Sequence, residues 1–434
     1  MFNDNIPKLR KKIGVLRLSD IIILFLCIIM LNTYTVLLHY NILFRSIIAG
    51  ILILYILKKG ISIDNTEQKL WLIFLGYIII NNIFSLNGQE SVRLIESLMI
   101  YSLFIYIGFS DNFYKRLLHI WNILIFLCVL TMFFSAIFKN SLSGFVNSIM
   151  IEATRDVVTK EMAAGIYSGI FGEKMNAAYA ASIGFVFAYS CYLKKTQVKF
   201  LLLSFYYIVA IFFTGKRISI LMLLFMIISS IYVNNKDKHY LHKSKKYILS
   251  AIILFFIVLI AFPEVRSSVG KIIGLFQNDG STDITSSRAT LLWPVGISMF
   301  MKNPLFGSGL CTYNKNMRLY YKDSGSILAN WSTNAHNIYL QTLAELGIIG
   351  ACILYGCFIY NLTHTVRLYR KVKDVDDKQL CIISLGIQVV FLLVGITENT
   401  FYTPAQLATY LIAIGIEVAM NKKYKYKGER IFNL

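Results

Sequence analysis

The chain alternates long apolar runs with mostly short polar links. About twelve runs are apolar over a length that lets a helix cross a bilayer. The sequence therefore predicts an all-α polytopic membrane protein in which residues 1–434 form a single integral membrane domain. The expected spans are 20–38, 42–58, 70–86, 93–110, 117–138, 176–193, 199–214, 217–233, 247–262, 337–361, 380–397 and 403–420.

Two polar links are much longer than the others, residues 139–175 and residues 263–335 between the ninth and tenth spans. Long loops in compact proteins usually carry function. In the larger loop, the polar segment 281–288 precedes apolar residues that include Leu291, Val295 and Met299. This spacing predicts an amphipathic helix on the membrane surface, which Pro294 is expected to bend.

Lysine and arginine fix the expected orientation. The chain has 43 of them against 23 acidic residues, and most fall in alternate links and at the two ends. Cytoplasmic links of membrane proteins carry this excess. Both termini are therefore expected in the cytoplasm, and the two long links on the outer face. The basic charge then needs no nucleic-acid partner, and membrane lipids are the expected surroundings.

Composition supports this class. Hydrophobic residues make up 56% of the chain and charged residues 15%, whereas a soluble domain has about 25% charged residues. The seven cysteines are scattered and show no metal or disulfide spacing. We expect no metal and no cofactor.

The candidate chemistry lies where polar links meet the outer ends of spans. Ser332, Thr333 and Asn334 have side chains that cap helices, and a helix is expected to start beside them. The charged groups in such positions are Lys216, Arg217, Arg288, His336 and Glu398, whereas Arg45, Glu96 and Glu417 lie within spans near their ends.

Each of these residues alone also has a structural interpretation. The basic residues of span ends extend to lipid head groups, Arg288 is an ordinary loop arginine, and His336 is a satisfied interfacial residue. Together they favour chemistry, because arginines bind phosphate oxygens and a histidine near neutrality removes a proton from a hydroxyl. A glycan carried on a polyprenyl pyrophosphate suits both groups, because it offers phosphate oxygens to the arginines and a sugar hydroxyl to the histidine.

One run of residues is a more specific signal than the separate charged residues. His336-Asn337-x-x-Leu340, followed by Glu345-x-Gly347-x-x-Gly350, resembles the signature of the bacterial O-antigen ligase and polymerase superfamily. The similarity spans roughly residues 170–400. Its other parts are the Phe171–Ala178 run, Thr214-Gly215-Lys216-Arg217, Ser287-Arg288 with Trp293, and Pro304-Leu305-Phe306-Gly307-Ser308-Gly309.

The resemblance implies a metal-independent glycosyltransferase with a fold like the type C glycosyltransferases, in the bacterial cytoplasmic (inner) membrane. It implies that Arg217 and Arg288 bind the lipid pyrophosphate and that His336 activates the acceptor hydroxyl. A single displacement is expected to invert the anomeric centre. Lys216, Asn337 and Tyr339 are expected to support them. Glu398 is added from its position in the last outer link.

We interpret the function as polymerisation of undecaprenyl-pyrophosphate-linked repeat units into O-antigen or capsule polysaccharide, with a chain-length regulator as a further partner. An O-antigen ligase, which transfers the glycan to lipopolysaccharide core, uses the same chemistry and stays open. A flippase for the lipid-linked glycan is the alternative of another class. Transporters place ionisable groups near the bilayer midplane, whereas the charges here gather at one face.

Overall fold

The computed structural model describes residues 18–31, 33, 35, 40–83, 88–138, 150, 152–195, 197–216, 260, 288–322 and 333–432. Within these residues the regular elements are helices, and an isolated bridge pairs Thr35 with Met150. The predicted helical class is therefore confirmed. Part of the larger predicted loop is helical as well, over Arg288–Lys302 and Tyr313–Tyr321.

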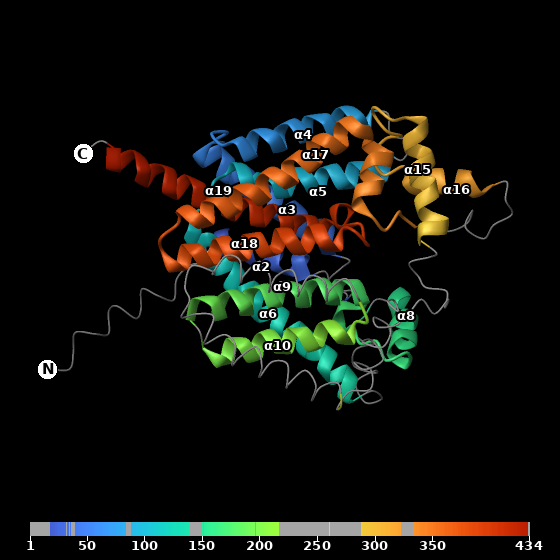
Figure 1. Ribbon diagram of the computed structural model, residues 1–434, viewed down its shortest axis with the longest axis horizontal. Helices are drawn as coiled ribbons and strands as arrows, with labels where there is room; N and C mark the ends of the chain where they lie inside the picture. Colours follow the sequence, from blue (N-terminus) through green and yellow to red (C-terminus); the bar gives the residue numbers. More distant parts are fainter. Residues whose placement is uncertain are drawn as a thin grey trace.

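The long helices lie side by side in a bundle with their axes in broadly one direction (Figure 1). The shorter α15 and α16 cover one end of α17, and we call this end of the bundle the α15–α16 end. The helices are α2 (Leu18–Leu31), α3 (Asn41–Lys59), α4 (Thr66–Asn82), α5 (Gly88–Tyr106), α6 (Asp111–Ile137), α8 (Glu152–Ala163), α9 (Lys174–Lys195), α10 (Val198–Phe213), α15 (Trp293–Lys302), α16 (Tyr313–Tyr321), α17 (Ile338–Lys371), α18 (Val375–Val394) and α19 (Pro404–Phe432).

Ten of the predicted spans coincide with helices, and 217–233 and 247–262 lie outside the described residues apart from Ile260. Among the described residues, four helices are long and apolar enough to cross a membrane: Asn41–Lys58, Asp111–Ile137, Ile338–Lys371 and Val375–Val394. Leu18–Leu31 and Val198–Phe213 are apolar but shorter. These helices fit a helical membrane protein, and the full number of twelve spans stays a prediction.

The first predicted span is longer than its helix. It was expected to reach residue 38, but the helix ends at Leu31, before the side chains of Thr33 and Thr35, which share a hydrogen bond. Pro294, which was expected to bend its helix, lies in the first turn of α15, directly after a π-helical turn at Arg288–Leu292. The bend itself stays a prediction.

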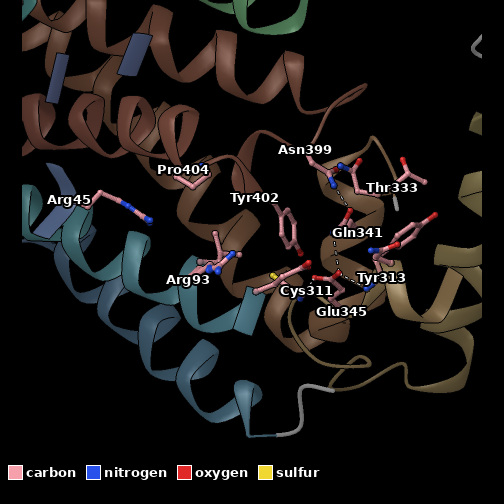
Figure 2. A pocket seen from close by; sticks show the side chains of 14 residues that line it. Arg45, Arg93, Cys311, Tyr313, Thr333, Gln341, Glu345, Asn399, Tyr402 and Pro404 are labelled. Carbon is pink, nitrogen blue, oxygen red and sulfur yellow. Dashed lines mark hydrogen bonds between the residues drawn. The ribbon is translucent and has the colours of Figure 1, made fainter. Parts of the chain in front are cut away.

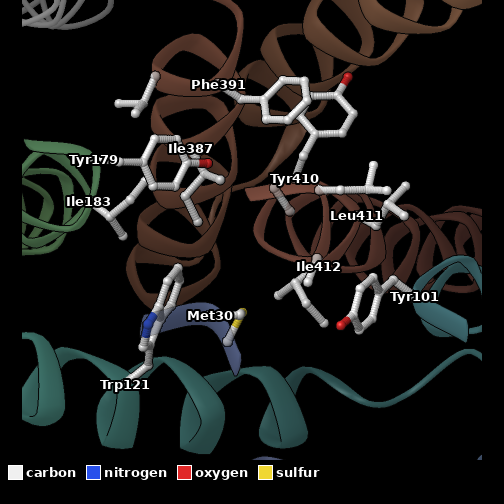
Figure 3. Packing of buried hydrophobic residues seen from close by; sticks show 14 of the residues in the cluster. Met30, Tyr101, Trp121, Tyr179, Ile183, Ile387, Phe391, Tyr410, Leu411 and Ile412 are labelled. Atoms are coloured by element: carbon white, nitrogen blue, oxygen red, sulfur yellow. The ribbon is translucent and has the colours of Figure 1, made fainter. Parts of the chain in front are cut away.

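The core is built around α19. Every residue from Ala405 to Met420 is buried, whereas a helix on the surface of the bundle would expose one face. Tyr410, Leu411 and Ile412 of this helix lie among side chains from α2, α5, α6, α9 and α18 (Figure 3). The surrounding helices are therefore held together through the chain's last helix.

A backbone break in α17 holds the loop between α15 and α16. Gly347 has φ 66°, outside the helical region. The break lets Ser308 and Gly309 donate backbone hydrogen bonds to the carbonyls of Ala344 and Glu345, at 3.0 and 2.9 Å. The buried Glu345 carboxylate accepts the N–H groups of Cys311 and Tyr313 (Figure 2). Glu345 therefore binds the backbone of this loop.

Replacing Gly347 by alanine is expected to destabilise the protein by about 1–3 kcal/mol, because φ is positive there and the new Cβ would collide with the backbone of Leu305. Thermal unfolding of the purified protein measures this. Gly356→Ala, in the same helix with open space around its Cβ, is the matched control and should be neutral or slightly stabilising. Equal melting temperatures of the two variants would contradict the prediction.

Candidate active site

His336 lies immediately before α17, in an unusual backbone conformation. The helix is capped by Asn337, whose side chain accepts a hydrogen bond from the Leu340 N–H at 2.9 Å. The predicted cap at residues 332–334 is therefore wrong. Asn334 instead accepts the backbone N–H of His336 at 2.9 Å. His336 has φ 48°, and non-glycine residues in this strained region concentrate at functional sites.

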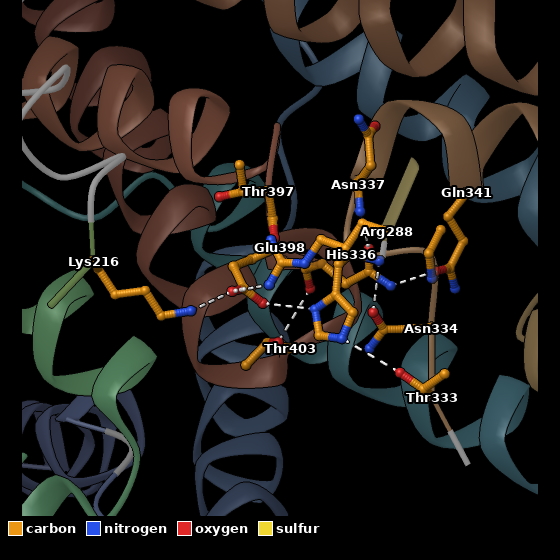
Figure 4. Close-up of polar contacts among 12 residues, drawn as sticks. Lys216, Arg288, Thr333, Asn334, His336, Asn337, Gln341, Thr397, Glu398 and Thr403 are labelled. Carbon is orange, nitrogen blue, oxygen red and sulfur yellow. Dashed lines mark hydrogen bonds and ion pairs between the residues drawn. The ribbon is translucent and has the colours of Figure 1, made fainter. Parts of the chain in front are cut away.

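The Glu398 carboxylate joins three basic side chains from separate parts of the chain (Figure 4). Its Oε1 accepts Lys216 Nζ at 2.6 Å and Arg288 Nη2 at 3.4 Å. Its Oε2 lies 3.0 Å from His336 Nδ1. The Arg288 Nη1 group also donates to the Thr397 carbonyl at 2.8 Å. We call Lys216, Arg288, His336 and Glu398 the Glu398 cluster.

Glu398 is a permanent negative charge. Burial of its side chain would raise its pKa, but the hydrogen bond with His336 and the charge of Lys216 outweigh burial and lower the pKa to about 2. Two fixed cations therefore face one carboxylate, and the cluster keeps a net positive charge even when His336 is neutral. Such a site favours an anionic group next to it.

The two ring nitrogens of His336 have different surroundings. Nδ1 faces Glu398, whereas Nε2 lies 3.3 Å from Thr333 Oγ1. A carboxylate at Nδ1 favours the tautomer with the proton on that nitrogen. Nε2 then carries the lone pair, so His336 is able to accept a proton on the side of Thr333.

Side-chain amides hold the segments of the site together. Asn399, next to Glu398, accepts the backbone N–H of Asn337 at 3.2 Å and bonds the side chain of Gln341. Gln341 in turn accepts the N–H of Ala335 at 3.1 Å. These contacts fix residues 335–337 against residues 397–399. Sequence reasoning missed Thr333, Gln341 and Asn399 as site residues, and their amide or hydroxyl side chains beside His336 and Glu398 were the available signal.

The predicted site residues are not all brought together. Arg288, His336, Glu398 and Lys216 meet, and Asn337 supports them as a helix cap. Arg217 lies outside the described residues. The Tyr339 hydroxyl donates to the Leu392 carbonyl at 2.8 Å, and its ring lies beside Tyr355. Tyr339 therefore joins α17 to α18 rather than the Glu398 cluster.

A second ionisable cluster lies towards the other end of the bundle. His364 Nδ1 is 2.6 Å from Glu417 and 3.4 Å from Glu67. The donor atoms of these three residues all lie within 4.8 Å of one another, a set that suits a cation. His364 is 28 residues further along α17 than His336, so this cluster is separate from the candidate active site.

One comparison with known protein families finds a match. A family model described as O-antigen ligase matches residues 202–355, a range that includes Lys216, Arg288 and His336, while Glu398 follows it. No curated protein matches the chain. The chain is thus similar to O-antigen ligase over residues 202–355, and this match supports the O-antigen ligase and polymerase superfamily.

Proposed function

We propose that the protein is a glycosyltransferase that joins repeat units carried on undecaprenyl pyrophosphate at the outer face of the bacterial cytoplasmic membrane. The product is an O-antigen or capsule polysaccharide. One observation carries the proposal: a single buried carboxylate orients His336, Arg288 and Lys216 together. A proton acceptor beside two phosphate-binding cations is what transfer from a lipid pyrophosphate requires.

The cations bind the donor. Arg288 uses Nη1 for Thr397 and Nη2 for Glu398, and a guanidinium carries five N–H donors, so donors are left for phosphate oxygens. Lys216 adds a point charge next to it. Both stabilise the negative charge that develops on the pyrophosphate as its bond to the anomeric carbon breaks. The resemblance adds Arg217 to this group.

His336 activates the acceptor. Its Nε2 takes the proton of an acceptor hydroxyl while the oxygen attacks the anomeric carbon of the donor sugar. The C–O bond forms on one face as the bond to pyrophosphate breaks on the other, so the anomeric centre inverts. Glu398 stabilises the imidazolium that results.

Replacing Arg288 by lysine should lower the rate of glycan transfer about 10²-fold, because the charge remains but the planar donor pair is lost. Purified enzyme in nanodiscs, supplied with lipid-linked repeat units, gives the rate from the release of undecaprenyl pyrophosphate. Arg318→Lys, on the exposed surface of α16, is the matched control. Wild-type rates in Arg288→Lys would remove this arginine from the donor site.

The ligase remains the second candidate, because the matching family model is itself described as O-antigen ligase. Acceptor identity separates the two. A strain lacking a polymerase keeps single repeat units on its surface acceptor, whereas a strain lacking a ligase keeps long chains on undecaprenyl pyrophosphate. Deleting the gene and analysing both pools tests which enzyme this is.

A flippase is the alternative from another class. Its loss would trap lipid-linked units in the inner leaflet, whereas loss of the transferase would leave them in the outer leaflet.

The proposal also includes the orientation, with both termini in the cytoplasm, and a chain-length regulator as a partner. Reporter fusions at each terminus test the orientation.

A further inference from the structure

A cavity of about 390 Å³ lies next to His336 at the α15–α16 end of the bundle. Thr333 and Asn334 line it, and these two residues contact the imidazole Nε2 and the backbone N–H of His336. The cavity therefore borders the side of the histidine that accepts a proton. Its volume is in the range of sites that bind small molecules or parts of larger ones.

Arg45 of α3 lines this cavity and is buried, with 8% of its surface exposed. Its Nη1 donates to Ser97 Oγ at 2.5 Å, but its Nε has no hydrogen-bond partner. Among the residues that the structure describes, it forms no ion pair with a carboxylate. A guanidinium stays charged at any physiological pH, and a buried charge without a counter-ion is unfavourable. This position calls for an anionic ligand.

Arg93 of α5 provides a second cation on the same side of the cavity. Figure 2 shows the Arg45 and Arg93 side chains extending towards each other there. Two carboxylates also line the cavity, Glu90 and Glu345. Glu345 is bound by the N–H groups of Cys311 and Tyr313 and by the Gln341 amide, so its hydrogen-bonding capacity is used within the protein.

The remaining wall suits a sugar. Amide and hydroxyl side chains make up much of it, and the aromatic ring of Tyr402 lies beside them. Hydroxyl groups of sugars pair with such amides, while sugar faces pack on aromatic rings. The polar residues of this wall are Asn314, Thr333, Asn334, Gln341, Asn399 and Tyr402.

We propose that this cavity is the acceptor subsite, in which Arg45 and Arg93 bind an oxyanion of the acceptor substrate. The inference rests on the proposed function and deepens it. The donor pyrophosphate occupies the Glu398 cluster, and the acceptor enters from α3 and α5 with its hydroxyl at His336 Nε2. The oxyanion belongs either to an acidic sugar of the glycan or to the phosphates of the acceptor's own lipid carrier.

Binding tests the subsite without catalysis. The full-length protein in nanodiscs of uncharged lipid is titrated with two probes: the repeat-unit oligosaccharide freed from its lipid, and inorganic pyrophosphate. At least one probe should bind, and Arg45→Gln and Arg93→Gln should each weaken that binding about tenfold or more, the size of one charge-assisted hydrogen bond. An effect on the oligosaccharide identifies a sugar oxyanion. An effect on pyrophosphate that Arg288→Lys does not reproduce identifies the lipid phosphates.

The control variant is Arg116→Gln. Arg116 of α6 is exposed and forms an ion pair with Asp20 of α2, so this variant should bind both probes as the wild type does. If Arg45→Gln fails to fold, the exposed Arg93 decides the question. Absence of binding of both probes to the wild type, or unchanged binding in the folded variants, overturns the proposal.

Kinetics separate this inference from the proposed function. With an acceptor analogue that carries the oxyanion identified by the binding test, either the free oligosaccharide or the oligosaccharide pyrophosphate, Arg93→Gln should raise the KM for the acceptor about tenfold while kcat changes little. A wild-type enzyme that forms no glycosidic bond defeats the proposed function but leaves the binding result standing. A wild-type enzyme that is active, with an unchanged acceptor KM in the variant, defeats the acceptor subsite alone.

Discussion

Replacing His336 by alanine should remove the long polysaccharide ladder and lower the transfer rate about 10²–10⁴-fold, the usual contribution of a general base. The alanine leaves Glu398 without its partner at Oε2 and leaves no group at the cavity edge to take the hydroxyl proton. Gel analysis of surface polysaccharide, together with the rate of undecaprenyl pyrophosphate release in vitro, measures both effects. Single repeat units should stay on the acceptor if the enzyme is the polymerase.

Alanine also disturbs the backbone, because His336 has φ 48°. Asparagine tolerates this conformation better, so His336→Asn separates loss of the imidazole from strain. It should fold as the wild type does and still fail in transfer. His119→Ala, an exposed histidine of α6, is the matched control. A full ladder from His336→Asn would take His336 out of the chemistry.

The pattern of apolar runs was sufficient to predict the helices, because span length and hydrophobicity are local properties. It also placed Arg288, His336 and Glu398 at one end of the bundle, since each lies where a polar link meets an apolar run. Their meeting at one carboxylate depends on how α17 and the 395–403 link pack together. The position of each of these residues at the outer face could be inferred beforehand, but the joint contact of Lys216, Arg288 and His336 with Glu398 could not.

The roles of Lys216, Gly347 and Arg45 depend on tertiary packing, so the sequence pattern could not predict them. Lys216 and Arg217 are neighbours in sequence, and the resemblance gave the pyrophosphate-binding role to Arg217 and a supporting role to Lys216. In the structure Lys216 forms an ion pair with Glu398. The break at Gly347 interrupts a run that looks like one continuous helix. Arg45 resembles an arginine that extends to lipid head groups, and only its burial beside a cavity indicates a ligand.

Replacing Glu398 by glutamine should lower the transfer rate roughly 10²-fold or more, because an amide keeps the shape but no longer fixes the tautomer of the histidine or stabilises its imidazolium. The wild-type carboxylate, with a pKa of about 2, is charged throughout the neutral range. The rate of undecaprenyl pyrophosphate release by the purified variant at neutral pH measures the effect.

The same substitution leaves Lys216 and Arg288 without their shared counter-ion, at a cost of about 1–3 kcal/mol of folding stability. Since the pKa of Glu398 falls from 4.5 to about 2 on folding, this stability is fully present above pH 4.5 and lost as the pH falls towards 2. Activities compared at neutral pH are therefore unaffected by that titration. Glu152→Gln, on the exposed surface of α8, controls for loss of one carboxylate. A purely structural role for Glu398 requires a lower melting temperature with an unchanged transfer rate in the protein that remains folded, whereas an orienting role lowers the rate of that folded protein.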